Sequence, residues 1–162
     1  MKSYLFVIFG SLPFLSSCDS NNSIQNGKSE IQEVENFIIE YYEVMSSRNW
    51  RAYQEFFSEK ATLTTIWQDS TEIRQQIFSN TISEFVAQTA NGPDSRPIFE
   101  EKPRTIDVEI KNNLASVWVK YEAKFGGKKD LIEWEGYDLF SLLKFNDKWY
   151  ITSITYISDE YE

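Results

Sequence analysis

The pattern of apolar and polar positions predicts helices in the first part of the chain. Apolar residues recur at helical spacing from Ile31 to Met45, and Ser29-Glu30-Ile31-Gln32 has the form of a capping box. Asn49 can cap a short second helix, in which Trp50 and Tyr53 lie on the same side. We therefore expect a long helix that begins at Ser29 and a short helix after residue 49.

A strand and a third helix are expected next. The run ATLTTIW, residues 61–67, is rich in β-branched residues and predicts a strand. Asp69-Ser70-Thr71-Glu72 has the form of a second capping box, and the tripeptide NGP at 91–93 would end the helix that follows it. This helix would bury an apolar face made of Ile73, Ile77, Phe78, Ile82, Phe85 and Val86.

The last third of the chain predicts strands. Apolar and polar residues alternate over 106–110, 115–123, 131–145 and 149–157, and the short sequences KNN, FGGKKD and NDK separate these runs. Consecutive strands on short turns form an antiparallel meander. Three helices followed by this meander predict an α+β domain, with the helices packed on one face of a curved, mainly antiparallel sheet.

Composition excludes several kinds of site. The chain of 162 residues has a formal net charge of −9 and no basic stripe, which argues against nucleic acid as a partner. It has no histidine and a single cysteine, so a Cys-based zinc site and a Ser-His-Asp triad are excluded. No glycine-rich phosphate loop is present, and we expect neither a metal site nor a cofactor.

The N-terminus resembles a bacterial lipoprotein signal. Lys2 is followed by an apolar stretch from Tyr4 to Leu15 and then by Leu15-Ser16-Ser17-Cys18. The resemblance implies cleavage before Cys18 and attachment of lipid to that residue, so the protein would be anchored in the bacterial cell envelope, in the inner or the outer membrane. The alternative is an ordinary secretory signal followed by a free cysteine.

These features give an expected domain organisation. Residues 1–17 would be the signal peptide, and 18–28, which are polar and rich in Asn and Ser, a flexible tether. Residues 29–158 would form the folded domain, and 159–162 an acidic tail.

Two segments resemble the nuclear-transport-factor-2-like superfamily, which includes ketosteroid isomerase and polyketide-cyclase-like proteins. FIIEYYEVMSSRNWRAYQEFFSEKATL is similar to the opening of that fold, and YDLFSLLKFNDKWYITSITY is similar to its closing hairpin. The resemblance covers about residues 30–157 and implies a cone-shaped domain with an internal pocket. It does not imply an activity, because this fold is found in enzymes and in non-catalytic binders.

The resemblance also implies positions for a site. Tyr41 and Asp138 match the two groups that donate hydrogen bonds to a carbonyl oxygen in the isomerase branch, and Thr65 stands where the general base is expected. A threonine hydroxyl is too weakly basic for that role. Asp69, four residues further on, is expected to cap the third helix rather than to serve as the base.

The strand that carries Asp138 predicts where its carboxyl points. Side chains alternate along a strand, so Asp138 shares a face with Trp134, Gly136, Phe140 and Leu142. A carboxyl among such neighbours should be protonated or hydrogen-bonded, and we expect Tyr41 to be its partner. The aromatic residues expected to line the pocket include Trp67, Trp134 and Phe140.

The remaining charged and aromatic residues are expected at the surface. Glu133 and Glu135 share the outer face of a strand, and Glu100 and Glu101 are also expected to be solvated. Trp118 lies on the polar side of its strand, and a tryptophan there suggests a homodimer packed sheet to sheet.

Taken together, the residues favour a non-catalytic envelope protein that binds a small apolar or aromatic ligand or acts as a dimerisation or accessory module. One alternative is an isomerase-, dehydratase- or cyclase-type enzyme in which Tyr41 and Asp138 polarise a carbonyl. Another is a structural envelope protein whose pocket is filled by its own aromatic side chains. An enzyme needs a base near the pocket, a binder needs an open cavity, and a structural protein needs a closed one.

Overall fold

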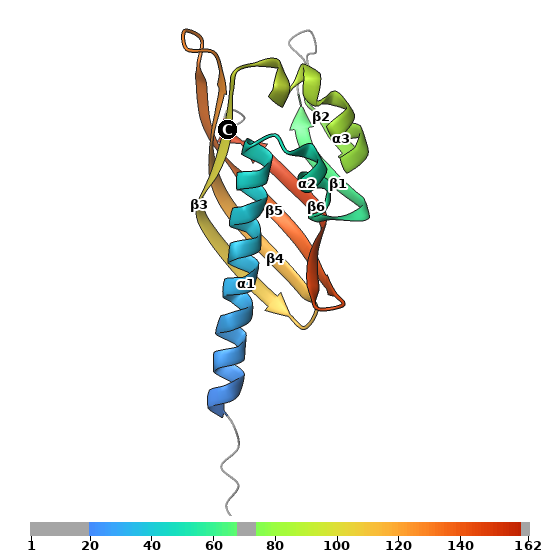
Figure 1. Ribbon diagram of the computed structural model, residues 1–162, viewed down its shortest axis with the longest axis vertical. Helices are drawn as coiled ribbons and strands as arrows, with labels where there is room; N and C mark the ends of the chain where they lie inside the picture. The colour runs from blue at the N-terminus through green and yellow to red at the C-terminus, as the bar shows by residue number, and fades with distance from the viewer. Residues whose placement is uncertain (1–19, 68–73, 160–162) are drawn as a thin grey trace, which may run out of the picture.

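The computed structural model describes residues 20–67 and 74–159, and the side chains of 20–27 and of residue 67 are not part of that description. The signal peptide at 1–17, Cys18, the capping box at 69–72 and most of the acidic tail therefore lie outside the described residues. Figure 1 shows a long helix, α1, lying along one face of a curved sheet, with two shorter helices near one end.

The sheet confirms the predicted meander and its place in an α+β fold. Its strand order is β2-β1-β6-β5-β4-β3, and neighbouring strands are antiparallel except for β1 and β6, which are parallel. Asn146 and Asp147 both have positive φ in the turn between the last two strands, as a tight hairpin requires. The strands are β1 (Phe57–Trp67), β2 (Gln76–Thr81), β3 (Ile98–Lys111), β4 (Leu114–Gly126), β5 (Ile132–Phe145) and β6 (Lys148–Ser158).

The helices cover the inner face of this sheet. They are α1 (Ser20–Ser46), α2 (Trp50–Gln54) and α3 (Ile82–Gln88), and two short 3₁₀ helices, η1 (Thr89–Asn91) and η2 (Pro93–Ser95), follow α3. The predicted cap of α2 is confirmed, because Asn49 Oδ1 accepts a hydrogen bond from the Ala52 amide at 3.2 Å. Along α1, the residues Val34, Ile38, Tyr41 and Met45 of the predicted apolar face are buried, whereas Ile31 is 37% exposed and Tyr42, which was not part of that face, is buried.

The start of α1 differs from the prediction. The helix begins at Ser20 rather than at Ser29, so residues 20–28, predicted as tether, are helical. Lys144 of β5 binds Glu30 at 2.9 Å and Glu33 at 3.2 Å, which holds this part of the helix against the sheet. A capping box is a local pattern, and a continuing helix satisfies the same amide groups with its own carbonyl oxygens.

The predicted third helix is wrong in its first half. Residues 76–81 form strand β2, which pairs with β1, and Ile77 and Phe78 are 81% and 45% exposed instead of buried. The helix begins only at Ile82, after a capping box that Thr81 and Glu84 form. The apolar spacing across 73–86 fits both a helix and an exposed edge strand, and pairing with β1 supplies the backbone hydrogen bonds that decide between them.

The core lies between α1 and the sheet. Val117, Phe140 and Ile151 are fully buried, and Trp149 and Ile154 are 2% exposed. Burying one such side chain stabilises the fold by about 1.5–3 kcal/mol, so this layer dominates the stability of the domain.

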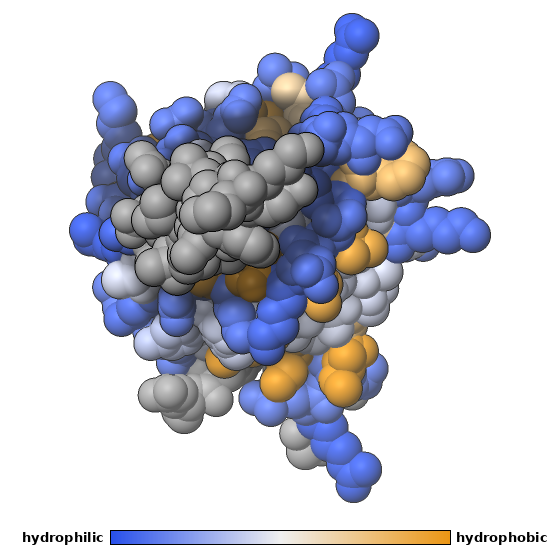
Figure 2. Space-filling view, turned by 90° about the horizontal axis from the view of Figure 1, so that it is seen from below, coloured by the Kyte–Doolittle hydropathy of each residue, from blue (hydrophilic) through white to orange (hydrophobic). Residues whose placement is uncertain are grey.

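Seen from below, the described surface is mainly hydrophilic with separate hydrophobic groups (Figure 2). Within the described part of the chain, no helix is both long and apolar enough to span a bilayer.

Candidate functional site

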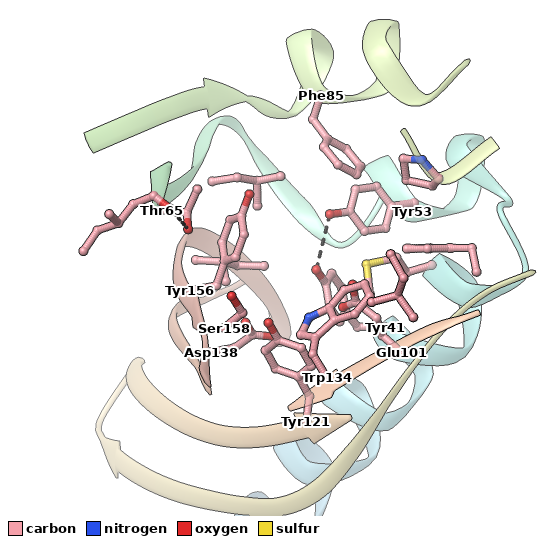
Figure 3. A pocket seen from close by; sticks show the side chains of 17 residues that line it. Tyr41, Tyr53, Thr65, Phe85, Glu101, Tyr121, Trp134, Asp138, Tyr156 and Ser158 are labelled. Carbon is pink, nitrogen blue, oxygen red and sulfur yellow. Dashed lines mark hydrogen bonds between the residues drawn. The ribbon is translucent and has the colours of Figure 1, made fainter. Parts of the chain in front are cut away.

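A cavity of about 400 Å³ lies between the end of α1, the helices α2 and α3, and the inner face of the sheet. Figure 3 shows Phe85 and Tyr53 toward the α3 side and Trp134 and Tyr121 on the sheet side. Ile132, which also lines the cavity, is 54% exposed, so the cavity is in contact with solvent at this edge. The full lining is Tyr41, Met45, Tyr53, Leu63, Thr65, Ile66, Phe85, Pro93, Phe99, Glu101, Tyr121, Ile132, Trp134, Asp138, Ile154, Tyr156 and Ser158.

Most of the residues predicted for the pocket are brought together there. Tyr41, Thr65, Trp134 and Asp138 all line the cavity. Phe140 does not, because it is fully buried beneath Tyr41, with ring centroids 5.2 Å apart and the rings nearly perpendicular. The side chain of residue 67, also predicted for the pocket, lies outside the described side chains.

Asp138 points into the pocket, as the alternation along β5 predicts. It is 6% exposed and lies between Val119 of β4 and Tyr156 of β6. Burial raises the pKa of its carboxyl from the ordinary 3.8 to about 7, although a hydrogen bond from Tyr42 acts in the opposite direction. Close to neutral pH the carboxyl is therefore partly protonated and able to donate a hydrogen bond.

The predicted partner of Asp138 is wrong by one residue. The Tyr42 hydroxyl, rather than that of Tyr41, donates a hydrogen bond to Asp138 Oδ2. The Tyr41 hydroxyl lies 3.3 Å from the hydroxyl of Tyr53 on α2 instead. Successive side chains on a helix point about 100° apart, so the rotation of α1 about its axis selects which tyrosine reaches Asp138.

Glu101 is a pocket residue that the sequence analysis placed at the surface. It lies on β3, half-buried, and lines the cavity together with Asp138. The pairing of β3 with β4 shifts register between Pro103 and Thr105, so Glu101 lies on the same face of the sheet as Ile106. A β-bulge of this kind inserts one residue and so changes the face on which the residues before it lie.

The environment of Glu101 also changes its acidity. Burial, with a smaller contribution from the nearby Asp138, raises the pKa of Glu101 from 4.5 to about 8. The Ser46 hydroxyl donates a hydrogen bond to the Glu101 carbonyl oxygen and accepts one from its amide, each at 2.9 Å. These bonds fix the position of Glu101 against the C-terminal end of α1.

The position of Tyr121 depends on a glycine across the strand pair. Tyr121 on β4 lies directly opposite Gly136 on β5, and its hydroxyl donates a hydrogen bond to the Ile157 carbonyl oxygen at 3.3 Å. A Cβ added at Gly136 would clash with the Tyr121 hydroxyl oxygen and with the Ile157 carbonyl oxygen. Only glycine permits this approach, which places the Tyr121 ring along the pocket wall.

The outer face of the sheet carries charges that are paired with one another. Glu133 and Glu135 are exposed and form ion pairs with Lys124 and Lys120 across the β4–β5 ladder, which confirms their predicted place on a solvated face. Such exposed pairs contribute little to stability.

The pocket combines aromatic walls with two carboxyl groups. Thr65 lines it, but its hydroxyl donates a hydrogen bond to the Ile66 carbonyl oxygen at 3.3 Å and supplies no base. The ionisable groups of the lining other than tyrosines are Glu101 and Asp138. Among the described residues, no group of three His, Cys, Asp or Glu side chains is placed to hold a metal ion.

Comparison with known proteins identifies the family. A family model described as "Putative lumazine-binding" matches residues 29–157. The chain belongs to this family. A comparison with curated proteins found no match.

Solved structures similar to this member of the family share its fold. An NTF2-like protein with a cystatin-like fold from Novosphingobium aromaticivorans is 8% identical, with a TM-score of 0.66 over 91% of this chain and 94% of that one. A "Putative Scytalone Dehydratase" from the same species is 12% identical (TM-score 0.65, covering 83% and 87%). The beta subunit of benzoate 1,2-dioxygenase from Burkholderia mallei is 11% identical (TM-score 0.63, covering 80% and 90%). These likenesses confirm the nuclear-transport-factor-2-like fold and carry no activity with them.

Proposed function

We propose that this protein is a lipid-anchored component of the bacterial cell envelope that binds a small apolar or aromatic ligand in its pocket without catalysis. The observation that carries the proposal is the cavity of about 400 Å³, walled by aromatic rings and containing the Asp138 carboxyl as a polar anchor. Ligand sites commonly enclose about 300–1,000 Å³ and combine apolar walls with a few convergent polar groups. An open cavity of this size argues against the alternative of a structural protein whose pocket is filled.

The family description suggests the first ligand to test. Lumazine is a flat bicyclic heteroaromatic molecule with ring carbonyls and N–H groups. Its faces would stack against rings such as those of Trp134 and Tyr121, and a protonated Asp138 would donate a hydrogen bond to a carbonyl oxygen. Binding of lumazine, or of another flat molecule of similar size, is therefore the expected activity of the pocket.

Isothermal titration calorimetry with lumazine tests this proposal. Trp134→Leu removes an aromatic wall and should weaken binding about twofold to tenfold, since an aromatic contact beyond its buried area contributes about 0.5–1.5 kcal/mol. Trp118→Leu is the matched control, because Trp118 is 53% exposed and is not part of the lining. Equal effects of the two substitutions, or no binding of any flat aromatic molecule to the folded chain, would contradict the proposal.

The lipid anchor rests on the N-terminal sequence. The run Leu15-Ser16-Ser17-Cys18 and the apolar stretch before it support processing and lipid attachment at Cys18. Cells that express the chain and are fed a labelled fatty acid should label the wild-type protein and not Cys18→Ser. Label on the Cys18→Ser protein would refute the anchor.

A second candidate function follows from Glu101. An enzyme of the isomerase, dehydratase or cyclase type needs a base in the pocket, and Glu101 is a carboxyl with a pKa of about 8 in the same cavity as Asp138. Ionised Glu101 would take a proton from the carbon next to a carbonyl, and the Tyr41 hydroxyl, which stays protonated because burial raises its pKa, would donate a hydrogen bond to the carbonyl oxygen. Deuterium exchange into 2-tetralone, followed by NMR, tests this candidate. Exchange at the rate of the buffer alone, or unchanged exchange in Glu101→Gln, would exclude it.

A homodimer through the outer sheet face is also proposed. Trp118 and Leu114 of β4 are 53% and 49% exposed, and Leu143 of β5, which pairs with Leu114, is 47% exposed. Apolar side chains grouped on a sheet face favour packing against a second copy. A light-scattering mass equal to one chain at high concentration would count against the dimer.

A further inference from the structure

The two pocket carboxyls have no basic partner among the described residues. The cavity lining contains no Lys or Arg, and none of the ion pairs of the described chain includes Glu101 or Asp138. The adjacent residue on β3 shows the contrast, because Glu100 pairs with Lys102 outside the pocket. The ion pairs of the described chain therefore join basic side chains to carboxylates of the surface and not to those of the pocket.

The carboxyl oxygens of Asp138 and Glu101 accept few hydrogen bonds from the described part of the chain. In the described part of the chain, Tyr42 donates to Asp138 Oδ2, while no side chain or backbone group donates to Asp138 Oδ1 or to the carboxyl of Glu101. Asp138 is 6% exposed, so its free oxygen lies in the cavity away from bulk water. A single donor would be enough for a neutral ligand, and a second buried carboxyl adds a desolvation cost and repulsion that such a ligand does not offset.

The walls of the same cavity are suited to a positive charge. The rings of Tyr41, Tyr53 and Phe85 line it on the helical side, and those of Tyr121 and Trp134 line it on the sheet side. The face of an aromatic ring attracts a cation, and the attraction grows when both are removed from water.

We propose that the pocket selects ligands that join an aromatic or apolar body to a positively charged amine, with Glu101 and Asp138 as the anionic partners of the amine. This inference rests on the proposed function, that the pocket binds a small ligand, and adds the charge of that ligand. The ammonium group would lie in the part of the cavity that the two carboxylates line, and the apolar body would occupy the aromatic part.

The affinity for a cation should change with pH in the opposite direction from the affinity for a neutral ligand. Without ligand, the carboxyls have pKa values of about 7 and about 8 and hold protons near neutral pH. A bound ammonium stabilises their ionised forms, so binding releases protons and becomes tighter as pH rises from about 6 to 8. A neutral ligand that accepts a hydrogen bond from a protonated carboxyl would become weaker over the same range.

The other titratable groups around the carboxyls do not contribute to this pH dependence of binding. They are tyrosines from α1, α2, β4 and β6, and burial raises the pKa of each, so all stay neutral between pH 6 and 8: Tyr41, Tyr42, Tyr53, Tyr121 and Tyr156.

Calorimetric titration of the purified full chain with tryptamine and tryptophol tests the inference. The two probes share an indole body and differ in carrying an ammonium or a hydroxyl group. Titrations at pH 6, 7 and 8, each in two buffers of different ionisation enthalpy, give the affinity and the number of protons released. At pH 8 we expect tryptamine to bind at least tenfold more tightly than tryptophol, because a charge-assisted hydrogen bond is worth at least that factor. The affinity for tryptamine should increase from pH 6 to pH 8, and its binding should release protons.

Three variants locate the effect. Asp138→Asn and Glu101→Gln should each weaken tryptamine about tenfold to a hundredfold and reduce the proton release, while tryptophol changes less. Glu100→Gln is the matched control on the opposite side of β3 and should leave both probes unchanged. Circular dichroism and the melting temperature show whether each variant folds. The wild-type pH series tests the inference even where a variant fails to fold.

The possible results distinguish a failure of this inference from a failure of the proposed function. Tighter binding of tryptamine with proton release supports the inference. Equal binding of both probes at every pH, with no proton release, overturns the inference and leaves the proposed function standing. Binding of neither probe, nor of lumazine, by the folded chain overturns both.

Discussion

The substitution Asp138→Asn should remove a pH-dependent penalty on folding. Asn has nearly the same shape and keeps an oxygen that accepts the hydrogen bond from Tyr42, but it does not titrate. In the wild-type chain, folding raises the pKa of Asp138 from 3.8 to about 7, so the folded state holds a proton that the unfolded state gives up. Stability from this group is fully present below pH 3.8 and is lost as pH rises through about 7.

The size of the effect follows from the two pKa values. Each pH unit over which only the folded state holds the proton changes the free energy of unfolding by about 1.4 kcal/mol. Between pH 5 and pH 8, Asp138 alone should therefore lower the stability of the wild-type chain by about 3 kcal/mol. The Asp138 charge also raises the pKa of Glu101, so its removal shifts the variant's stability in the same direction.

Urea denaturation followed by tryptophan fluorescence measures this difference. The stability of Asp138→Asn relative to wild type should increase by about 3 kcal/mol from pH 5 to pH 8. Glu133→Gln is the control, because Glu133 lies exposed on the same strand in an ion pair with Lys124 and should change stability by less than about 1 kcal/mol. Parallel pH profiles of wild type and Asp138→Asn, separated by a constant amount, would refute the buried, protonated carboxyl.

Other predictions test the neighbours of this carboxyl and the outer face. Tyr42→Phe removes the hydrogen bond that lowers the pKa of Asp138, so the carboxyl should titrate above pH 7 in a carbon-13 NMR titration; an unchanged midpoint would contradict the contact. Gly136→Ala should destabilise the chain by about 1–3 kcal/mol in urea denaturation, since its methyl group clashes with Tyr121; wild-type stability would show that the approach is not tight. Trp118→Ser should lower the light-scattering mass from two chains to one, whereas an unchanged mass would remove Trp118 from the dimer contact.

The last four strands were predictable, apart from the first half of β3 before residue 106, because one face of the sheet is buried. Alternation along β5 correctly placed Asp138 and Phe140 on the inner face, since the side-chain period of a strand is two and a slip would expose the apolar set. Glu101 was placed at the surface for its charge, in a segment not predicted as a strand, and the bulge before Thr105 sets the face on which it lies. A signal was present in the sequence: Phe99 and Ile106 are both apolar and are separated by an odd number of positions, which simple alternation does not allow.

Features that depend on packing were less predictable. Tyr41 and Tyr42 are neighbours on one helix, and the choice of Asp138's partner depends on how α1 is rotated against the sheet, which no local pattern specifies. Residues 76–81 became a strand because β1 offered an edge for pairing, a contact between segments whose spacing alone also fits a helix. The cavity itself is the space that these packings leave between α1, α3 and the sheet.

The central claim is that the pocket holds a small aromatic ligand, and native mass spectrometry of the protein purified from its own host tests it most directly. We expect a mass above that of the chain and its lipid, and release of a small aromatic molecule when the protein is unfolded. The Trp134→Leu protein prepared in the same way should carry less of that molecule than the Trp118→Leu control. Wild-type protein that carries only its lipid under the gentlest conditions, and that takes up no molecule from a host extract, would contradict the claim.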